Sequence, residues 1–308
     1  MRIAIFCATR RGYLMLRTLG ALVPQAEVVV FSFREEPSEP PFFEDIRKLA
    51  LEHNARFFEG KQVGGSRWSQ FWASNEFDLM FAVSWRYMIP HDVYRRARLG
   101  SFVFHDSLLP AYRGFSPTVW AILNGEDHTG VTLFEMAEEV DAGDILDQTP
   151  VPIGPHDTIG EVIERVTETY LVLLERNIAA LMAGMAVSRP QDPRLATYTC
   201  KRMPEDNLID WSRPSQAIYD LIRAVSRPYS GAYTLLDGRK MLVWSAGPVN
   251  PGRYVGSVPG RVAEVRPGVG SLILTGDGSI LLTQVELESG HTVCAADVLK
   301  SLSQTVGR

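Results

Sequence analysis

Residues 101–117 read SFVFHDSLLPAYRGFSP, an apolar run that ends in His105 and continues into a proline-containing turn. A continuous apolar run is typical of a strand whose two faces are both covered. A histidine at the carboxyl end of such a strand lies where open α/β sheets bind their ligands, although a loop histidine can also simply bond to the backbone. Residues 101–105 therefore predict a buried strand with a candidate site at its end.

The chain around this stretch alternates between strand and helix patterns, which is typical of a parallel sheet with crossover helices. We expect strands at 3–7, 27–32, 79–84, 101–105 and 130–136, and helices at 13–22 and 43–53. The capping box of Thr158 and Glu161 opens a further amphipathic helix that ends near Gly184. Residues 1–187 therefore predict a Rossmann-like α/β domain, with a mostly parallel sheet and helices on both faces.

The remainder of the chain has a different pattern. Residues 188–204 contain three prolines and no periodicity, which indicates a linker. Within residues 205–308, a helical pattern at 214–226 is followed by short strand patterns between glycine-containing turns. We expect these strands at 232–236, 240–245, 260–265, 271–275 and 280–286. This spacing predicts a small open β-barrel of the OB type as the C-terminal domain.

Composition and charge exclude several classes of protein. The 308 residues carry 31 Lys and Arg against 36 Asp and Glu, and the net charge of -5 gives no overall attraction to nucleic acid or an anionic membrane. The three cysteines lie far apart, which excludes a disulfide framework and a CxxC metal site and favours the cytoplasm. No 18-residue apolar run occurs, and the histidines lack metal-ligand spacing. We expect neither a membrane span nor a bound metal.

A second candidate for the site follows the expected strand at 130–136. Residues 138–144 read EEVDAGD, an acidic loop whose glycine allows a tight backbone. Such a loop can be only a solvated turn. Asp141 and His105 nevertheless follow neighbouring strands, and a carboxylate beside an imidazole can orient the ring or accept a proton. The two residues form a candidate acid/base pair.

The stretch HDSLLPAYRG at 105–114 resembles the motif His-x-Ser-Leu-Leu-Pro-x-Tyr-Arg-Gly of the folate-dependent formyltransferase superfamily. The segments WAILNGE (120–126), TGVT (129–132) and DAGDIL (141–146) agree with that family in order and spacing. The resemblance implies N-formylation of a primary amine, with 10-formyltetrahydrofolate as co-substrate. It implies that His105 and Asp141 are catalytic, and that Ser107 orients the substrate or caps the turn. It also implies a pterin site formed by Tyr87, Met88, Ile89, Ala137, Glu138, Glu139 and Val140.

Val103 departs from this resemblance, because the family carries a third catalytic residue, an asparagine, two positions before the histidine. Residues 103 and 105 share one face of the expected strand, so Val103 lines the same cleft without an amide donor. Loss of one oxyanion donor costs on the order of 2.7–4 kcal/mol. Three alternatives are open: replacement by Asn124, a backbone amide or water; a slow enzyme; or a different reaction or binding alone.

The acceptor is indicated by the loop at 34–45, which reads REEPSEPPFFED. This acidic loop repels phosphates, whereas the tRNA-modifying branch of the family carries basic residues there. The loop is closer to the sugar-nucleotide branch, so we expect a nucleotide-linked amino sugar and no nucleic acid. The alternatives are a methionyl-tRNA formyltransferase and a non-catalytic folate or nucleotide binder. Arg10, Arg11 and Arg113 are candidates for the diphosphate, or they brace turns. No feature of the sequence indicates an oligomeric state.

Overall fold

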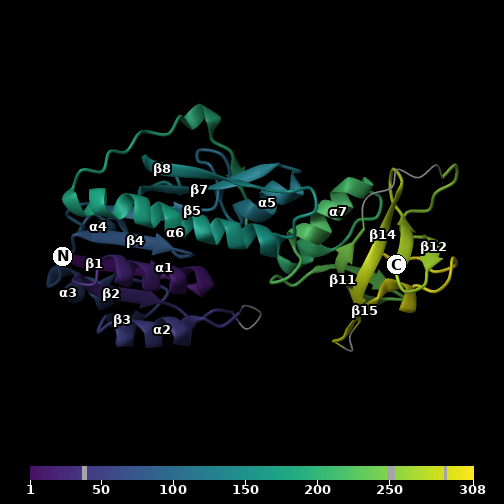
Figure 1. Ribbon diagram of the computed structural model, residues 1–308, viewed down its shortest axis with the longest axis horizontal. Helices are drawn as coiled ribbons and strands as arrows, with labels where there is room; N and C mark the ends of the chain where they lie inside the picture. The colour runs from purple at the N-terminus through teal and green to yellow at the C-terminus, as the bar shows by residue number, and fades with distance from the viewer. Residues whose placement is uncertain (37–39, 248–253, 288–289) are drawn as a thin grey trace. The chain divides into compact units, whose positions relative to one another are not determined.

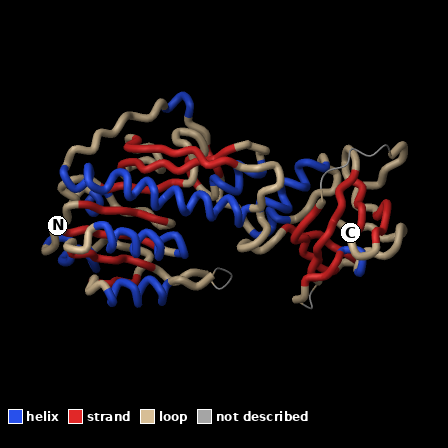
Figure 2. Tube along the Cα trace, in the orientation of Figure 1, coloured by secondary structure: helices blue, strands red, loops and turns tan. Residues whose placement is uncertain are grey.

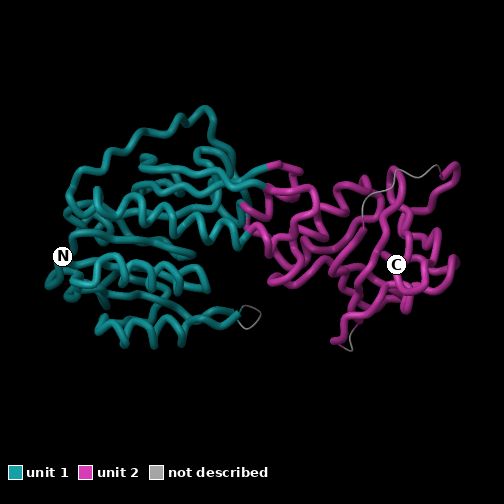
Figure 3. Tube along the Cα trace, in the orientation of Figure 1, with its two compact units in different colours: residues 1–117, 128–152, 163–200 teal, residues 118–127, 153–162, 201–308 magenta. Residues whose placement is uncertain are grey.

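The computed structural model of the chain describes residues 1–36, 40–247, 254–287 and 290–308. Residues 37–39 of the predicted acidic loop therefore lie outside the described part. Two compact units are present (Figure 3): unit 1 comprises residues 1–117, 128–152 and 163–200, and unit 2 comprises residues 118–127, 153–162 and 201–308. The predicted domain limits of 1–187, 188–204 and 205–308 stay a prediction.

Unit 1 is built on a seven-stranded sheet, whose strands are Arg2–Cys7 (β1), Glu27–Ser32 (β2), Arg56–Glu59 (β3), Leu79–Val83 (β4), Ser101–His105 (β5), His128–Glu135 (β7) and Ile145–Pro152 (β8). Their order is β3-β2-β1-β4-β5-β7-β8, which runs from bottom to top of the unit in Figure 1. Neighbours from β3 to β5 are parallel, whereas β7 is antiparallel to both β5 and β8. The predicted mostly parallel sheet is confirmed.

Helices cover both faces of this sheet, as predicted. Helix α1 (Thr9–Leu22) lies on the face that carries Ile3 and Cys7, so close that a Cβ on Gly12 would stand 3.0 Å from the Cβ of Cys7. Helix α3 (Ser66–Ala73) covers the opposite face, where its Trp68 and Trp72 enter the core. The other helices are α2 (Phe43–Glu52), α4 (His91–Tyr94), α5 (Pro117–Leu123) and α6 (Ile159–Ala183). Two short strands, β6 (Arg113–Gly114) and β9 (Tyr198–Thr199), pair in parallel outside the main sheet.

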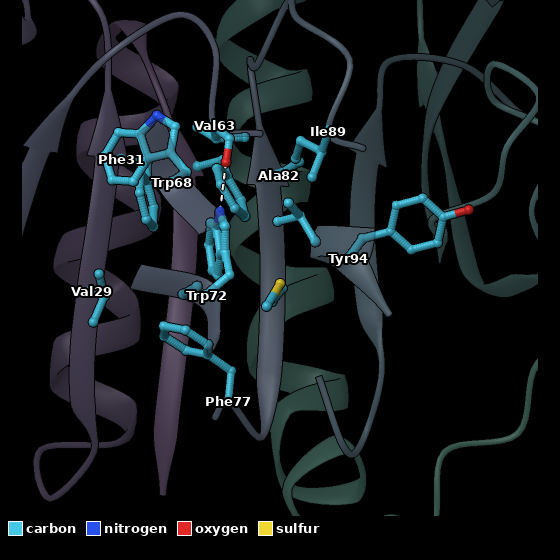
Figure 4. Close-up of a cluster of buried hydrophobic side chains, with 13 residues drawn as sticks. Val29, Phe31, Val63, Trp68, Trp72, Phe77, Ala82, Ile89 and Tyr94 are labelled. Atoms are coloured by element: carbon cyan, nitrogen blue, oxygen red, sulfur yellow. Dashed lines mark hydrogen bonds between the residues drawn. The ribbon is translucent and has the colours of Figure 1, made fainter. Parts of the chain in front are cut away.

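An aromatic core fills the face that α3 covers (Figure 4). The ring of Phe31 in β2 stacks on Phe6 and Trp72, with centroids 4.9 and 5.4 Å apart, and meets Trp68 edge-on at 5.5 Å. The indole N–H of Trp72 donates to the carbonyl of Val63 at 2.6 Å, so the ring is buried without an unsatisfied donor. Because β1 and β4 both contribute to this core, their carboxyl ends provide a rigid base for the loops that follow.

Several elements differ from the prediction for local reasons. Helix α1 begins at Thr9 rather than residue 13, because its first residues are polar or glycine and add no apolar periodicity. Strand β8 was not predicted, because it lies at the sheet edge and half of its residues are half-buried, so no apolar run marks it. The predicted helices at 43–53 and 158–184 are confirmed as α2 and α6.

Unit 2 contains helix α7 (Ser215–Ala224) and an antiparallel sheet, which Figure 2 shows as the cluster of strands in the C-terminal part of the chain. Its strands are Ala232–Leu236 (β10), Arg239–Ala246 (β11), Val262–Arg266 (β12), Gly270–Leu274 (β13), Ser279–Glu286 (β14) and Thr292–Cys294 (β15). The order is β10-β11-β14-β13-β12, and β15 pairs with β14. The predicted helix and short strands are confirmed, with β15 as an addition. Short 3-10 turns lie at Pro204–Asn207 and Ala295–Asp297 in unit 2, and at Pro193–Leu195 in unit 1.

Candidate active site

His105 is the last residue of β5, and only 8% of its surface is exposed. Its Nε2 lies 2.8 Å from the carbonyl oxygen of Tyr112. Because a carbonyl oxygen can only accept, Nε2 carries a proton and the lone pair of the neutral ring is on Nδ1. Nδ1 faces Oδ2 of Asp141 at 3.6 Å. The imidazole is therefore held in one tautomer, with its second nitrogen toward a carboxylate.

Asp141 lies in the loop after β7 with a left-handed backbone, at φ +54°. This conformation costs a non-glycine residue about 1–3 kcal/mol and persists only where the surroundings impose it. Its Oδ2 accepts a hydrogen bond of 2.8 Å from the backbone N–H of Gly114. Gly143 packs so tightly that an added Cβ would stand 1.8 Å from the carbonyl oxygen of Glu135. The structure thus brings together both members of the predicted acid/base pair.

The loop that follows β5 is held by side chains of β7, the neighbour of β5, and of β8, the next strand in the sheet. The hydroxyl of Thr132 in β7 donates to the carbonyl of Ser107 at 2.6 Å and accepts from the N–H of Leu109 at 3.1 Å. Gln148 in β8 donates to the carbonyl of Leu109 at 2.8 Å and to Thr132 Oγ1 at 2.9 Å. The buried hydroxyl of Ser107 donates to the carbonyl of Ala111 at 2.7 Å. In this structure Ser107 therefore closes the turn.

Asp106 forms a largely buried ion pair directly beside His105. Its carboxylate accepts from Arg11 Nη1 at 2.8 and 2.9 Å and from the hydroxyl of Tyr170, and the Arg11 guanidinium lies 4.7 Å from the centroid of the Tyr170 ring. Burial alone would raise the pKa of the Asp106 carboxyl, but the charge of Arg11 and the hydrogen bond from Tyr170 hold the pKa below its ordinary 3.8. Burial and the Asp106 charge raise the pKa of Tyr170 well above 10.0, so its hydroxyl remains a donor. The pair ties the end of β5 to α1 and α6.

The three arginines predicted for a diphosphate lie in different surroundings. Arg10 is exposed and pairs with Glu164 at 2.6 Å. Arg11 belongs to the ion pair described above. Arg113 is buried, with 4% of its surface exposed, and its Nε and Nη2 donate to Oε1 of Gln191 at 3.2 and 2.7 Å. Arg11 and Arg113 thus have partners inside the protein, whereas Arg10 presents its guanidinium at the surface.

Other chemistries have less support within the described residues. No group of three His, Cys, Asp or Glu side chains there is arranged to hold a metal ion. The same residues include no helix with the length and apolar character needed to cross a membrane. Burial raises the pKa of the Cys7 thiol at the end of β1, which opposes formation of a nucleophilic thiolate.

Comparison with known proteins places the chain in a family. Residues 23–177 match the family described as Formyl transferase, and residues 201–303 match the family described as Formyl transferase, C-terminal domain. The chain belongs to the formyl transferase family.

One curated relative of this chain is the bifunctional polymyxin resistance protein ArnA of Wigglesworthia glossinidia brevipalpis, which is 31% identical over 246 residues. That match covers 80% of this chain and 38% of the relative. HypX from Aquifex aeolicus, solved in complex with tetrahydrofolic acid, has a TM-score of 0.63 at 22% identity. The match covers 97% of this chain and 47% of HypX. An N-formyltransferase from Helicobacter canadensis, solved with folinic acid and dTDP-3-aminofucose, has a TM-score of 0.65 at 17% identity, and covers 91% of this chain and 98% of that one. These two structures share the fold, and the chain spans less than half of ArnA and HypX.

The residues that the family resemblance predicts for the pterin lie in two loops of unit 1. Tyr87, Met88 and Ile89 follow β4: the Tyr87 ring is edge-on to Trp85, Met88 is exposed, and Ile89 is buried. The second loop follows β7, where Ala137 and Glu138 line a hollow of about 410 Å³ together with residues of α4, and Glu139 and Val140 are exposed. Ile89 packs in the same cluster as Tyr94, which also lines the hollow. Gly100 and Ser101 also line the hollow, so it lies at the amino end of β5, whereas His105 lies at the carboxyl end of that strand.

Val103 occupies the position at which the family carries its asparagine. In β5 it pairs with Ala82 of β4 and Phe134 of β7, and its side chain packs against Leu109, Phe134 and Ile145. The position is apolar in the structure as well as in the sequence. Asn124, the predicted substitute donor, follows α5 in unit 2.

Three polar residues of the site were not predicted. Thr132 lies in β7 and Gln148 in β8. Thr132 is a polar residue inside an otherwise apolar strand, and this was the feature of the sequence that could have pointed to it. Gln191 lies in the predicted linker, 78 residues from Arg113, and its irregular surroundings carry no pattern that points to the site. Its position is a finding of the structure alone.

Proposed function

We propose that this chain transfers the formyl group of 10-formyltetrahydrofolate to the primary amine of a nucleotide-linked amino sugar. The observation that carries the proposal is the ordered pair of His105 and Asp141 in a member of the formyl transferase family. In this reaction the amine nitrogen bonds to the formyl carbon, and the bond from that carbon to N10 of the folate breaks. The proton that the amine loses is returned to N10, so both products are neutral at the reacting atoms.

His105 supplies a hydrogen-bond donor in this scheme. Its Nε2–H is used by the carbonyl of Tyr112, so Nδ1 is the nitrogen left for a reactant. When Nδ1 is protonated it can donate to the formyl oxygen, which gains negative charge as the amine attacks. The Asp141 carboxylate faces this nitrogen at 3.6 Å.

Asp141 is the group that accepts the amine proton and passes it on. Its Oδ2 is fixed by the N–H of Gly114, which keeps the carboxylate beside His105 while the proton moves. General acid–base catalysis by one positioned group typically contributes about 10²–10⁴-fold in rate. The two side chains therefore divide the work between oxygen stabilisation and proton transfer.

A folate donor is supported by features of unit 1 as well as by relatives. HypX was solved with tetrahydrofolic acid and the Helicobacter N-formyltransferase with folinic acid. The indole N–H of Trp85, next to Tyr87, is buried without a hydrogen-bond partner among the described residues. An aromatic ligand with polar edges fits such surroundings.

An amino sugar nucleotide as acceptor is supported by charge and by relatives. The net charge of -5 opposes binding to tRNA. The Helicobacter enzyme was solved with dTDP-3-aminofucose, and ArnA is a curated relative. The exposed Arg10 guanidinium is the candidate for the diphosphate that the structure leaves at the surface.

A second candidate function is binding of folate and nucleotide without transfer. Val103 favours it, because this side chain packs in an apolar cluster where the family has an amide donor. Loss of one such donor lowers a rate by about 10²–10³-fold. A cytoplasmic location stays a prediction for either function.

The test incubates the full chain with 10-formyltetrahydrofolate and a panel of UDP- and dTDP-linked amino sugars, and detects the N-formyl product by mass spectrometry. We expect product with the wild type and at least about 100-fold slower turnover for His105→Ala and Asp141→Ala. Folate binding by calorimetry with no product across the panel supports the second candidate. A salt-sensitive gel shift with initiator tRNA supports tRNA formylation instead. Unchanged turnover in both variants rules out the proposed roles.

A further inference from the structure

The predicted linker contains a segment, residues 189–199, that lies against both loops of the candidate site. At one end, Arg189 and Ile145 exchange backbone hydrogen bonds of 2.8 Å just after the Asp141 loop. At the other end, β9 pairs with β6 in the loop that follows His105. The hydroxyl of Thr197 also accepts from the N–H of Tyr112 at 2.8 Å. The two ends of this segment thus contact the two loops of the candidate site in unit 1, whereas Arg194 between them pairs only with Asp192 among the contacts described.

Gln191 connects the two loops through one side chain. Its Nε2 donates to the carbonyl oxygens of Asp141 and Gly143 at 2.9 and 2.7 Å. Its Oε1 accepts from Nε and Nη2 of Arg113 at 3.2 and 2.7 Å. Both N–H donors of the amide and its oxygen are therefore used. An apolar side chain of similar size would leave two carbonyls and a buried guanidinium without these partners.

The position of Arg113 makes this connection relevant to the reaction. The residue before it, Tyr112, provides the carbonyl that fixes Nε2 of His105, and the residue after it, Gly114, provides the N–H that fixes Asp141. Tyr112 has φ +61° and Asp141 has φ +54°, conformations that disfavour non-glycine residues and need support from neighbouring groups. Gln191 binds the backbone of one of these residues directly and reaches the other through Arg113.

We propose that Gln191 is a positioning residue for formyl transfer, which holds the Asp141 loop and the His105 loop at the separation that the reaction needs. Gln191 acts through Arg113 and through the backbone of Asp141, and it does not touch the reactants. A displacement of about 1 Å at a reacting group can cost about 100-fold in rate. The inference rests on the proposed function, because it assumes that His105 and Asp141 act as described above.

The kinetic test compares Gln191→Met with Arg194→Gln, a control in the same segment whose guanidinium is bound to Asp192. We expect kcat to fall about 10–100-fold in Gln191→Met, with KM for the formyl donor changed less than about twofold, and no change in Arg194→Gln. Gln191→Glu keeps the acceptor for Arg113 but loses both donors, so we expect kcat to fall in this variant too. Arg113→Met combined with Gln191→Met is expected to be no slower than the slower single variant, because the two side chains act as one unit.

A second measurement separates failure of this inference from failure of the proposed function. Hydrogen exchange followed by mass spectrometry is expected to accelerate at least about 10-fold in peptides covering 110–116 and 139–145 of Gln191→Met, but not in Arg194→Gln. This readout does not need activity. Unchanged exchange in both peptides, or kcat equal to wild type with an active enzyme, overturns the inference. If exchange is faster in Gln191→Met but the wild type forms no product, Gln191 does hold the two loops in place, and the proposed function is ruled out.

Discussion

Two adjacent arginines at the start of α1 allow the buried ion pair to be tested against a surface one. Arg11 pairs with Asp106, and the two side chains are 14% and 18% exposed. Arg10 pairs with Glu164, and these side chains are 47% and 55% exposed. The two residues are neighbours in one helix, so Arg11→Gln and Arg10→Gln have the same effect on helix propensity and net charge. Their difference in stability therefore reports the surroundings of each pair.

The expected magnitudes follow from burial. Removing one partner of a buried pair leaves the other charge without compensation and costs about 3–5 kcal/mol. Because Asp106 retains the hydroxyl of Tyr170 and some solvent, we expect the lower end, about 3 kcal/mol, for Arg11→Gln. An exposed pair contributes about 0–1 kcal/mol, so Arg10→Gln is expected to cost less than about 1 kcal/mol.

Urea titration with hydrogen exchange of peptides from β1 and β5 reports the unfolding of unit 1, and peptides from β13 in unit 2 provide an internal reference. With a urea m-value of about 2 kcal/mol/M, the expected midpoint shifts are about 1.5 M for Arg11→Gln and below about 0.5 M for Arg10→Gln. Equal shifts for the two variants would refute the reasoning, because they would show that burial of the Asp106 pair contributes nothing beyond a surface contact.

Three further predictions concern pH, loop packing and the missing amide. The pKa of Asp106 is below 3.8 in the folded state, so its ionised carboxylate stabilises the fold above pH 3.8, and this contribution is lost as the pH falls through the folded pKa. Asp106→Asn should therefore make acid unfolding, followed by circular dichroism, less steep. Gly143→Ala should lower turnover at least about 100-fold, because its Cβ would stand 1.8 Å from the Glu135 carbonyl, whereas Gly256→Ala, whose Cβ would meet no atom of the described residues within 4 Å, should match wild type. Val103→Asn should raise turnover about 10²–10³-fold, and a rate at or below wild type would show that another group already supplies the donor.

Much of the framework could be predicted from the sequence because its signals are local. Each signal lies within one continuous segment of at most 25 residues: the apolar runs of β1, β4 and β5, and the apolar periodicity of α6. All four elements have the expected type. Edge strand β8 could not be found in this way, because its half-buried residues follow neither pattern. Strand-end position and residue type were also sufficient to select His105 and Asp141, which the structure brings to 3.6 Å.

The contacts that orient these residues depend on chain segments far apart in sequence. Tyr170 reaches Asp106 across 64 residues, and Gln191 reaches Asp141 across 50. A single glutamine between two prolines resembles any polar loop residue until the fold places it against two carbonyls. The burial of Arg113 is equally a tertiary effect, since the same motif is compatible with an exposed guanidinium.

The segment at 189–199 also decides where this chain can be recombined. A chimera that joins residues 1–187 to a foreign C-terminal domain would lack Gln191, Thr197 and β9. The contacts that these residues make with the two loops of the candidate site would then be lost. A junction after Cys200, the last residue of unit 1, keeps every one of these contacts within a single parental sequence. Exchange of C-terminal domains that preserves these contacts therefore needs a crossover after Cys200, 17 residues beyond Ala183 at the end of α6.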